Sequence, residues 1–257
     1  PQFYSFTPQV QTKCSRHTSD IIMNKRIKNY HTVTHQWKGE DWVLHPLKGM
    51  FWVGENRLLI TDLHLGKTRH FQRSGIYLPE GSDVATLDSL EVMMTTFSPA
   101  EVWILGDLFH SHFEKRAWDR LAGWLNRFTH ISWCLVLGNH DIIQKGYYEA
   151  IGISCFQRFQ AKSGMELVHR PDEAMETGVT LAGHIHPGIE LHGRGRQRLV
   201  LPCFYFTDRL CMLPALGRFT GLSRIQPQTP SEEVFVTTSD KVIPIPSLRP
   251  EDPYDKS

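Results

Sequence analysis

The sequence predicts an α+β protein in which mixed β-sheets are covered by helices. Three apolar runs of strand length, residues 57–61, 101–105 and 131–137, are separated by two segments with helical spacing of their apolar side chains. After residue 165 the chain contains short strand patterns separated by turns instead. Strands that alternate with helices pair in parallel or mixed sheets, so the first half predicts parallel neighbours with helices as cover.

The first half of the predicted fold begins with two strands, at residues 42–45 and 49–53. Apolar side chains at helical spacing predict one helix over residues 84–97 and a second over residues 113–128. A short helix is expected near residues 147–151.

The second half is predicted to consist of strands and turns. The strand patterns lie at residues 165–169, 179–182, 189–192, 198–201, 204–206, 211–213 and 234–237. Residues 1–41 are polar and show no sustained period, so we expect a disordered N-terminal extension there. One domain is predicted over residues 42–245, followed by a flexible, proline-rich tail at residues 246–257.

The composition predicts a soluble globular protein, with 40% hydrophobic and 21% charged residues. The formal net charge of +1 does not by itself indicate a polyanionic partner. The five cysteines form no CxxC pair, which argues against a zinc ribbon or a disulfide framework and favours a cytoplasmic location. No apolar run approaches the roughly 18 residues of a membrane span, so no membrane association is expected.

Residue types that bind metals or catalyse reactions directly follow five of the strand patterns. They are Asp62 with His64, Asp107, Asn139 with His140 and Asp141, His169, and His184 with His186. Because a sheet gathers its strand ends along one edge, these five ends can converge on one site. In an extended segment residues two apart point the same way, so His184 and His186 are expected to aim at one spot. Carboxylates, imidazoles and one amide oxygen suit manganese, iron or zinc better than copper or calcium.

These motifs, in this order, resemble the calcineurin-like metallophosphoesterase superfamily. Further segments, among them residues 63–67, 108–110, 201–204 and 213–215, are similar to the bacterial DNA-ligase-associated metallophosphoesterases. The resemblance covers roughly residues 42–245. It implies a four-layer αββα fold, with two mixed β-sheets flanked by helices.

The resemblance also implies a site for two divalent metal ions, with Mn²⁺ as the first expectation and iron or zinc as alternatives. One ion would be held by Asp62, His64 and His186, the other by Asn139, His169 and His184, and Asp107 would bridge them. A hydroxide shared by the two ions would attack phosphorus.

Two further residues are interpreted as catalytic. His140 is expected to stabilise the phosphoryl oxygens or to protonate the leaving alkoxide. Asp141 either orients His140 or caps the helix that follows, and the sequence leaves both interpretations open.

Weaker signals point to contacts with the substrate. The side chains concerned are Lys67, His110, Arg194, Arg196 and Arg198. The three arginines alternate on a predicted hairpin and suit a polyanion, although an ordinary solvated surface is the simpler interpretation.

The function expected from the resemblance is dinuclear-metal-dependent hydrolysis of phosphodiester bonds in nucleic acid, linked to DNA repair. A DNA ligase and a helicase are the functional partners that it implies. The first alternative is a phosphatase or a small-molecule phosphodiesterase that acts on cyclic nucleotides or nucleotide-lipids. The second is a scaffold without enzymatic activity, which the complete set of candidate ligands disfavours.

Overall fold

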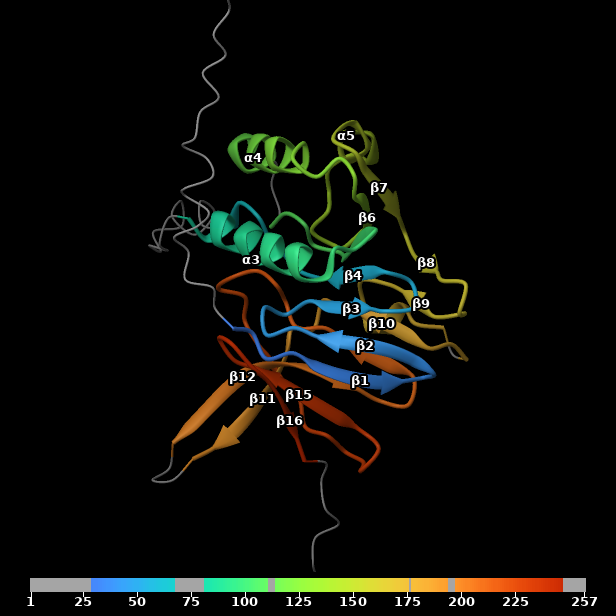
Figure 1. Cartoon of the computed structure of the whole chain (residues 1–257), viewed down its shortest axis with the longest axis vertical. Helices are drawn as coiled ribbons and strands as arrows, with labels where there is room; N and C mark the ends of the chain where they lie inside the picture. The colour runs from blue at the N-terminus through green and yellow to red at the C-terminus, as the bar shows by residue number, and fades with distance from the viewer. Residues whose placement is uncertain (1–28, 68–80, 111–113, 176, 194–196, 247–257) are drawn as a thin grey trace, which may run out of the picture.

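The computed structural model describes residues 29–67, 81–110, 114–175, 177–193 and 197–246. Two mixed β-sheets pack face to face, and the described α-helices lie together on the outer side of the first sheet (Figure 1). The two packed mixed sheets confirm the fold that the resemblance implied, although in the described residues α-helices cover only the first sheet. In the part of the chain that is described, no helix has the length and apolar character needed to cross a membrane.

The first sheet has seven strands that follow one another in chain order. They are β1 (Val33–Trp37), β2 (Glu40–Leu44), β3 (Met50–Trp52), β4 (Arg57–Ile60), β5 (Glu101–Leu105), β6 (Ser132–Val136) and β7 (Ile153–Phe156). β1 to β4 pair antiparallel, whereas β4 to β7 pair in parallel. The parallel strands alternate with α3 (Ser82–Phe97), α4 (Lys115–Leu125) and α5 (Lys145–Ala150), because parallel neighbours need a crossover.

The period-two geometry of the strands places apolar side chains of the first sheet in two layers, one on each face. Leu58 and Ile60 of β4 belong to the layer that contains Leu90 of α3. Leu59, between them, belongs to the layer between the sheets, together with Phe204 of the second sheet. Burial on both faces explains why these strands are continuous apolar runs in the sequence.

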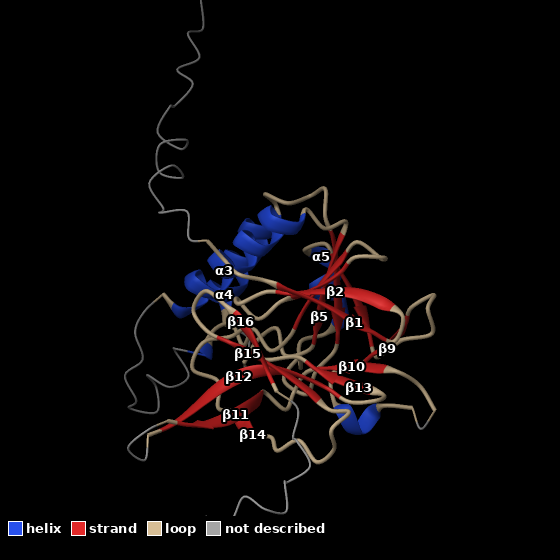
Figure 2. Cartoon of the chain, turned by 60° about the horizontal axis from the view of Figure 1, so that its bottom comes forward, coloured by secondary structure: helices blue, strands red, loops and turns tan. Residues whose placement is uncertain are grey.

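The second sheet contains the remaining strands, most of them short (Figure 2). They are β8 (Phe159–Gln160), β9 (Glu166–Leu167), β10 (Thr180–Ala182), β11 (Pro187–His192), β12 (Arg198–Phe206), β13 (Leu210–Met212), β14 (Ser223–Arg224), β15 (Glu233–Thr237) and β16 (Val242–Ile245). β9, β10 and β13 pair in parallel, and a 3₁₀ helix, η1 (Pro171–Glu173), lies between β9 and β10 in the chain. β11 and β12 form a long antiparallel hairpin.

The folded part begins earlier than the sequence predicted. β1 lies within the segment assigned to a disordered extension and pairs with β2 over five residues. Its sequence, VTHQW, alternates side chains toward and away from the core, and Trp37 is buried at its end. Residues 1–28 and 247–257, the rest of the predicted extension and almost all of the predicted tail, lie outside the described residues.

The two strands predicted at residues 198–201 and 204–206 are one strand, β12. β12 changes partner near Pro202: residues before it pair with β11, and Cys203 to Phe206 pair with β15. A proline, which donates no backbone hydrogen bond, is tolerated where a strand changes partner. The sequence analysis also missed β7, β8, β14 and β16.

Candidate metal centre

The candidate metal-binding side chains follow the carboxyl ends of parallel strands in both sheets. Asp62 and His64 follow β4, and Asp107 follows β5. His169 follows β9, and His184 and His186 follow β10; Asn139 and His140 follow β6. The two sheet edges meet here, because the backbone N–H of His184 donates to Asp62 Oδ2 over 2.9 Å.

We call one group of these side chains the Asp62 cluster: Asp62, His64 and His186, whose ligand atoms lie within 4.8 Å of one another. His186 Nε2 is 3.2 Å from Asp62 Oδ1. His64 Nε2 is 3.8 Å from Asp62 Oδ1 and 3.9 Å from Asp107 Oδ2, so it faces two carboxylates beyond hydrogen-bonding distance. Asp62 and His64 are both buried.

The second group, the Asp107 cluster, consists of Asp107, His169 and His184, again with ligand atoms within 4.8 Å of one another. His169 Nε2 lies 3.5 Å from Asp107 Oδ2, 3.1 Å from His184 Nδ1 and 3.1 Å from Asn139 Oδ1. Asn139 therefore joins this cluster. Asp107 Oδ2 faces His64 as well as His169, so Asp107 stands between the two clusters.

The ligand atoms of both clusters are arranged in a way that suits the binding of cations. His186 Nδ1 donates to the Gly221 carbonyl over 3.1 Å, and His169 Nδ1 donates to the Leu105 carbonyl over 2.8 Å. In a neutral imidazole each of these bonds leaves a lone pair on Nε2, which points at carboxylate or amide oxygens. Among the described residues, nothing forms a hydrogen bond with the buried Asp62 Oδ1. Acceptors that converge in this way call for a positive charge between them, and two such groups are consistent with a dinuclear metal site.

The pKa values of His64, His169 and Asp107 show that the two clusters differ in electrostatic environment. Burial of His64 outweighs the two carboxylates and lowers its pKa to about 3. Burial acts on His169 in the same direction, but its hydrogen bond to Asp107 and the charges of Asp107 and Asp62 raise its pKa to about 9. The pKa of Asp107 falls to about 2, because contacts with His169 overcome the effect of burial.

Five of the six cluster residues have a left-handed backbone. Their φ angles are 52° for Asp62, 48° for His64, 53° for Asp107, 68° for His184 and 53° for His186. This conformation is uncommon outside glycine and costs on the order of 1 kcal/mol or more per residue. The expected extended geometry of His184 and His186 is therefore wrong: β10 ends at Ala182, and the two side chains enter different clusters.

Two glycines allow the cluster residues to approach one another closely. A Cβ on Gly183 would lie 1.8 Å from Thr61 Oγ1 and 2.8 Å from Asp62 Oδ2. A Cβ on Gly106, where φ is +85°, would lie 2.0 Å from His169 Nδ1. Neither position accepts a side chain unless a cluster residue moves.

Asp141 has neither of the roles considered for it. Its carboxylate accepts hydrogen bonds from the backbone N–H groups of Asp107 (2.8 Å), Leu108 (3.0 Å) and Gly138 (2.9 Å). The Tyr148 hydroxyl adds a longer contact of 3.4 Å. The helix that follows, α5, has Gln144 at its N-cap. Asp141 therefore ties the loop after β6 to the loop after β5, which positions Asp107.

His140 and His110 lie beside the Asp62 cluster. Their rings are 5.5 Å and 5.6 Å from the ring of His64 and stack on each other at 5.6 Å. The backbone N–H of His140 donates to Asp107 Oδ1 over 2.9 Å, which fixes its position relative to both clusters. Lys67 is close enough to influence the charges of His64 and Asp62, and burial lowers the pKa of its ammonium group.

Of the three arginines predicted to contact the substrate, only Arg198 is among the described residues, and it does not lie at the metal centre. Arg198 lies opposite His192 at the far end of the β11–β12 hairpin, about 17 Å along the strand from Pro187. There it faces Glu190 at 3.6 Å. Arg194 and Arg196 lie outside the described residues.

The loop at residues 216–221 supports the centre, a role that the sequence analysis did not assign to it. The N–H groups of Leu216 and Gly217 donate to the carbonyls of Thr61 and Asp62, each over 2.9 Å. At the other end of the loop, Gly221 accepts the hydrogen bond from His186. Gly217 and Gly221 mark a turn in the sequence, but a turn signal does not say which side chains the turn supports.

The fold and the two clusters define a metal-dependent phosphoesterase. The chain belongs to the calcineurin-like phosphoesterase family, whose model matches residues 56–221, more than half of its 257 residues. It is therefore a hydrolase of the metallophosphoesterase type.

Solved structures similar to this chain include the following two. One is the crystal structure of the Pseudomonas putida nuclease MPE, with a TM-score of 0.71 and 26% sequence identity, covering 84% of this chain and 100% of the nuclease. The other is Yfce, a phosphoesterase from E. coli, with a TM-score of 0.42 and 15% identity, covering 75% of this chain and 99% of Yfce. A sequence search of curated proteins finds no match.

Proposed function

We propose that this metal-dependent phosphoesterase is a nuclease that hydrolyses phosphodiester bonds in nucleic acid. The observation that carries the proposal is the similarity to the Pseudomonas putida nuclease over that protein's whole length. The metal centre alone does not choose between a diester and a monoester, because the same chemistry serves many substrates.

In this proposal Asp62, His64 and His186 hold one divalent ion. Asn139, His169 and His184 would hold the other, with Asp107 as the residue that the two ions would share. The distances of 3.9 Å and 3.5 Å from Asp107 Oδ2 to His64 and His169 support the shared role of Asp107. When bound, two such ions supply Lewis acidity that activates water and neutralises charge on the phosphoryl oxygens.

The protein's own contribution beside the ions comes from His140. Its backbone is fixed by Asp107 and its ring stacks on His110, so the imidazole is held at the edge of the Asp62 cluster. From there we propose that it donates a hydrogen bond to a phosphoryl oxygen or a proton to the leaving alkoxide. His110 and Lys67 are proposed substrate contacts, because both lie near the same cluster. Asp141 acts indirectly, by positioning Asp107.

Further parts of the proposal rest on the motifs in the sequence. We propose Mn²⁺ as the metal, with iron and zinc as alternatives, and a role in DNA repair together with a DNA ligase and a helicase. The proposed cytoplasmic location is supported by the cysteines: the four within the described residues are free and buried.

The test uses metal-stripped protein reloaded with Mn²⁺, with bis-p-nitrophenyl phosphate, p-nitrophenyl phosphate and single-stranded DNA as parallel substrates. We expect diester hydrolysis and DNA cleavage. His140→Ala should keep both ions and lose roughly a hundredfold or more in rate, the usual contribution of a general acid. Hydrolysis of the monoester alone, with DNA intact, would favour the phosphatase or small-molecule alternative.

A further inference from the structure

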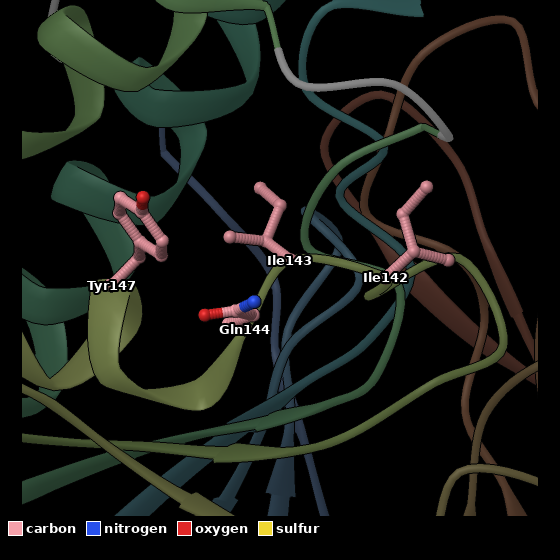
Figure 3. A pocket seen from close by; sticks show the side chains of 4 residues that line it. All are labelled: Ile142, Ile143, Gln144 and Tyr147. Carbon is pink, nitrogen blue, oxygen red and sulfur yellow. The ribbon is translucent and has the colours of Figure 1, made fainter.

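A small apolar cavity lies directly after the His140 segment. Its volume is about 310 Å³, within the range of small ligand pockets, and it is lined by Ile142, Ile143, Gln144 and Tyr147. Figure 3 shows the two isoleucines and the Tyr147 ring rising from the same side of the chain, with the Gln144 amide between Ile143 and Tyr147 in this view.

The walls of this cavity are unusually open to solvent for apolar side chains. Ile142 is 67% exposed and Tyr147 is 56% exposed. A single exposed apolar side chain needs no explanation, but a concave group of them beside a reaction centre marks a binding surface.

The cavity is attached to the metal centre by a short, hydrogen-bonded segment of chain. The N–H of Ile142 donates to the His140 carbonyl over 2.9 Å, and the N–H of Tyr147 donates to the Gln144 carbonyl over 3.0 Å. Asp141, between His140 and Ile142, is bound to the loop that carries Asp107. The cavity therefore begins two residues after His140, on a segment that is fixed to the loop that carries Asp107.

The Tyr147 ring packs against another aromatic ring. It meets the ring of Trp118 edge to face, with 6.4 Å between centroids and an interplanar angle of 86°. An aromatic side chain that is supported on one side and exposed on the other offers a flat surface for stacking.

We propose that this cavity binds the nucleobase of a nucleotide joined to the scissile phosphate, an inference that rests on the proposed nuclease function. Among the described residues, none of the side chains that line the cavity is charged, so this lining does not suit a second phosphate. A nucleobase has apolar faces and a polar edge. Tyr147 and the isoleucines would contact the faces, and the Gln144 amide, which both donates and accepts, would meet the edge.

The test compares diesters that share one leaving group. The substrates are the 5′ and 3′ p-nitrophenyl phosphate esters of thymidine and, without a base, methyl p-nitrophenyl phosphate, each with Mn²⁺-loaded protein. We expect kcat/KM for at least one thymidine ester to exceed that for the methyl ester by about fivefold or more, the lower end of what one stacked base contributes.

Tyr147→Ala should remove most of this preference, while kcat/KM for the methyl ester changes by less than about twofold. Tyr147→Phe should keep the preference, because the ring remains. The matched control is Leu199→Ala, another exposed apolar side chain, at 57%, on the distant hairpin. Melting curves of all variants show whether each is folded.

Three results would overturn the inference. If Tyr147→Ala lowers the rate equally for all esters, the side chain supports the metal centre and not a base. If the preference is unchanged, the cavity holds no base. If Tyr147→Ala instead changes the oligomeric state, measured as the molecular mass in solution, the cavity is an interface between copies of the chain. Failure of the wild-type protein to cleave DNA, with the methyl ester still hydrolysed, would refute the proposed nuclease function itself.

Discussion

The Asp62 cluster and the Asp107 cluster use the same residue types but balance charge differently. In the Asp62 cluster, burial keeps His64 neutral, with a pKa of about 3. In the Asp107 cluster, contact with a carboxylate keeps His169 protonated, with a pKa of about 9. Two histidines beside carboxylates can therefore differ as ligands. Hydrogen bonds to Asp107 and to the Leu105 carbonyl help to raise the pKa of His169, whereas the carboxylates near His64 lie beyond hydrogen-bonding distance and burial dominates there.

The clusters also have different supports. The Asp107 cluster depends on Asp141, whose carboxylate holds the loops after β5 and β6 together. The Asp62 cluster depends on the loop at residues 216–221, which contacts both Asp62 and His186. One support is an ionised side chain and the other is backbone, so we expect them to respond differently to mutation.

Replacing Asp107 should have the largest effect, because it stands between the clusters. Asp107→Asn keeps the shape but removes the charge that both groups of histidines face. We expect weak binding of both ions and a loss of about a thousandfold in rate, equivalent to about 4 kcal/mol of charge stabilisation. Metal content by mass spectrometry and bis-p-nitrophenyl phosphate hydrolysis measure the two effects. A variant that keeps two ions and its activity would refute the shared role.

Metal binding should depend on pH at the Asp107 cluster more than at the Asp62 cluster. Below about pH 9 an ion must displace the proton of His169, so affinity should rise about tenfold per pH unit as pH increases towards that value. His64 carries no proton above about pH 3, so it adds no such slope. Calorimetric titration of metal-free protein with Mn²⁺, in two buffers of different ionisation enthalpy, counts the protons released at each site. Equal proton release at both sites would contradict the distinction.

Asp141→Asn should destabilise the Asp107 side of the centre. The amide group would turn an N–H towards backbone donors that now meet a carboxylate oxygen, at a cost of about 2 kcal/mol in the free energy of unfolding. Tyr148→Phe is the matched control, because its 3.4 Å contact to the same carboxylate is long and its removal should cost less than about 1 kcal/mol. Denaturant unfolding of the metal-free proteins measures both. If Asp141→Asn lost activity while its free energy of unfolding stayed unchanged, the result would favour the first interpretation, in which Asp141 orients His140.

Replacing Phe219, in the loop that supports the Asp62 cluster, should have the smallest effect, a change in the free energy of unfolding. It lies in the supporting loop at a φ of 59°, a conformation that is strained for a bulky side chain. Phe219→Gly should raise the free energy of unfolding by up to about 1 kcal/mol, because glycine relieves the strain. Phe219→Ala keeps the strained backbone and should not raise it. Thermal unfolding of the two variants side by side decides the point, and equal stability would show that the loop carries no strain there.

Much of the first sheet could be predicted because its signals are local. The apolar runs that became β4, β5 and β6 are buried on both faces, and the helical periodicity between them is strong. The second sheet was harder, because several of its strands are only two or three residues long and exist through their neighbours. β1 was missed because its alternating pattern is partly polar.

The sequence by itself determined which chemical groups the centre contains and that they follow strand ends, because both are properties of order and residue type. Order and residue type do not say how these groups are divided, a division that the resemblance implied and that only the tertiary structure produces. The left-handed backbone at Asp62, His64, Asp107, His184 and His186 turns neighbours such as His184 and His186 into different clusters. That conformation is unfavourable locally and is maintained by contacts distant in sequence, such as Asp62 with His184 and His186 with Gly221. The local sequence pattern therefore cannot predict this left-handed backbone, because contacts distant in sequence stabilise it.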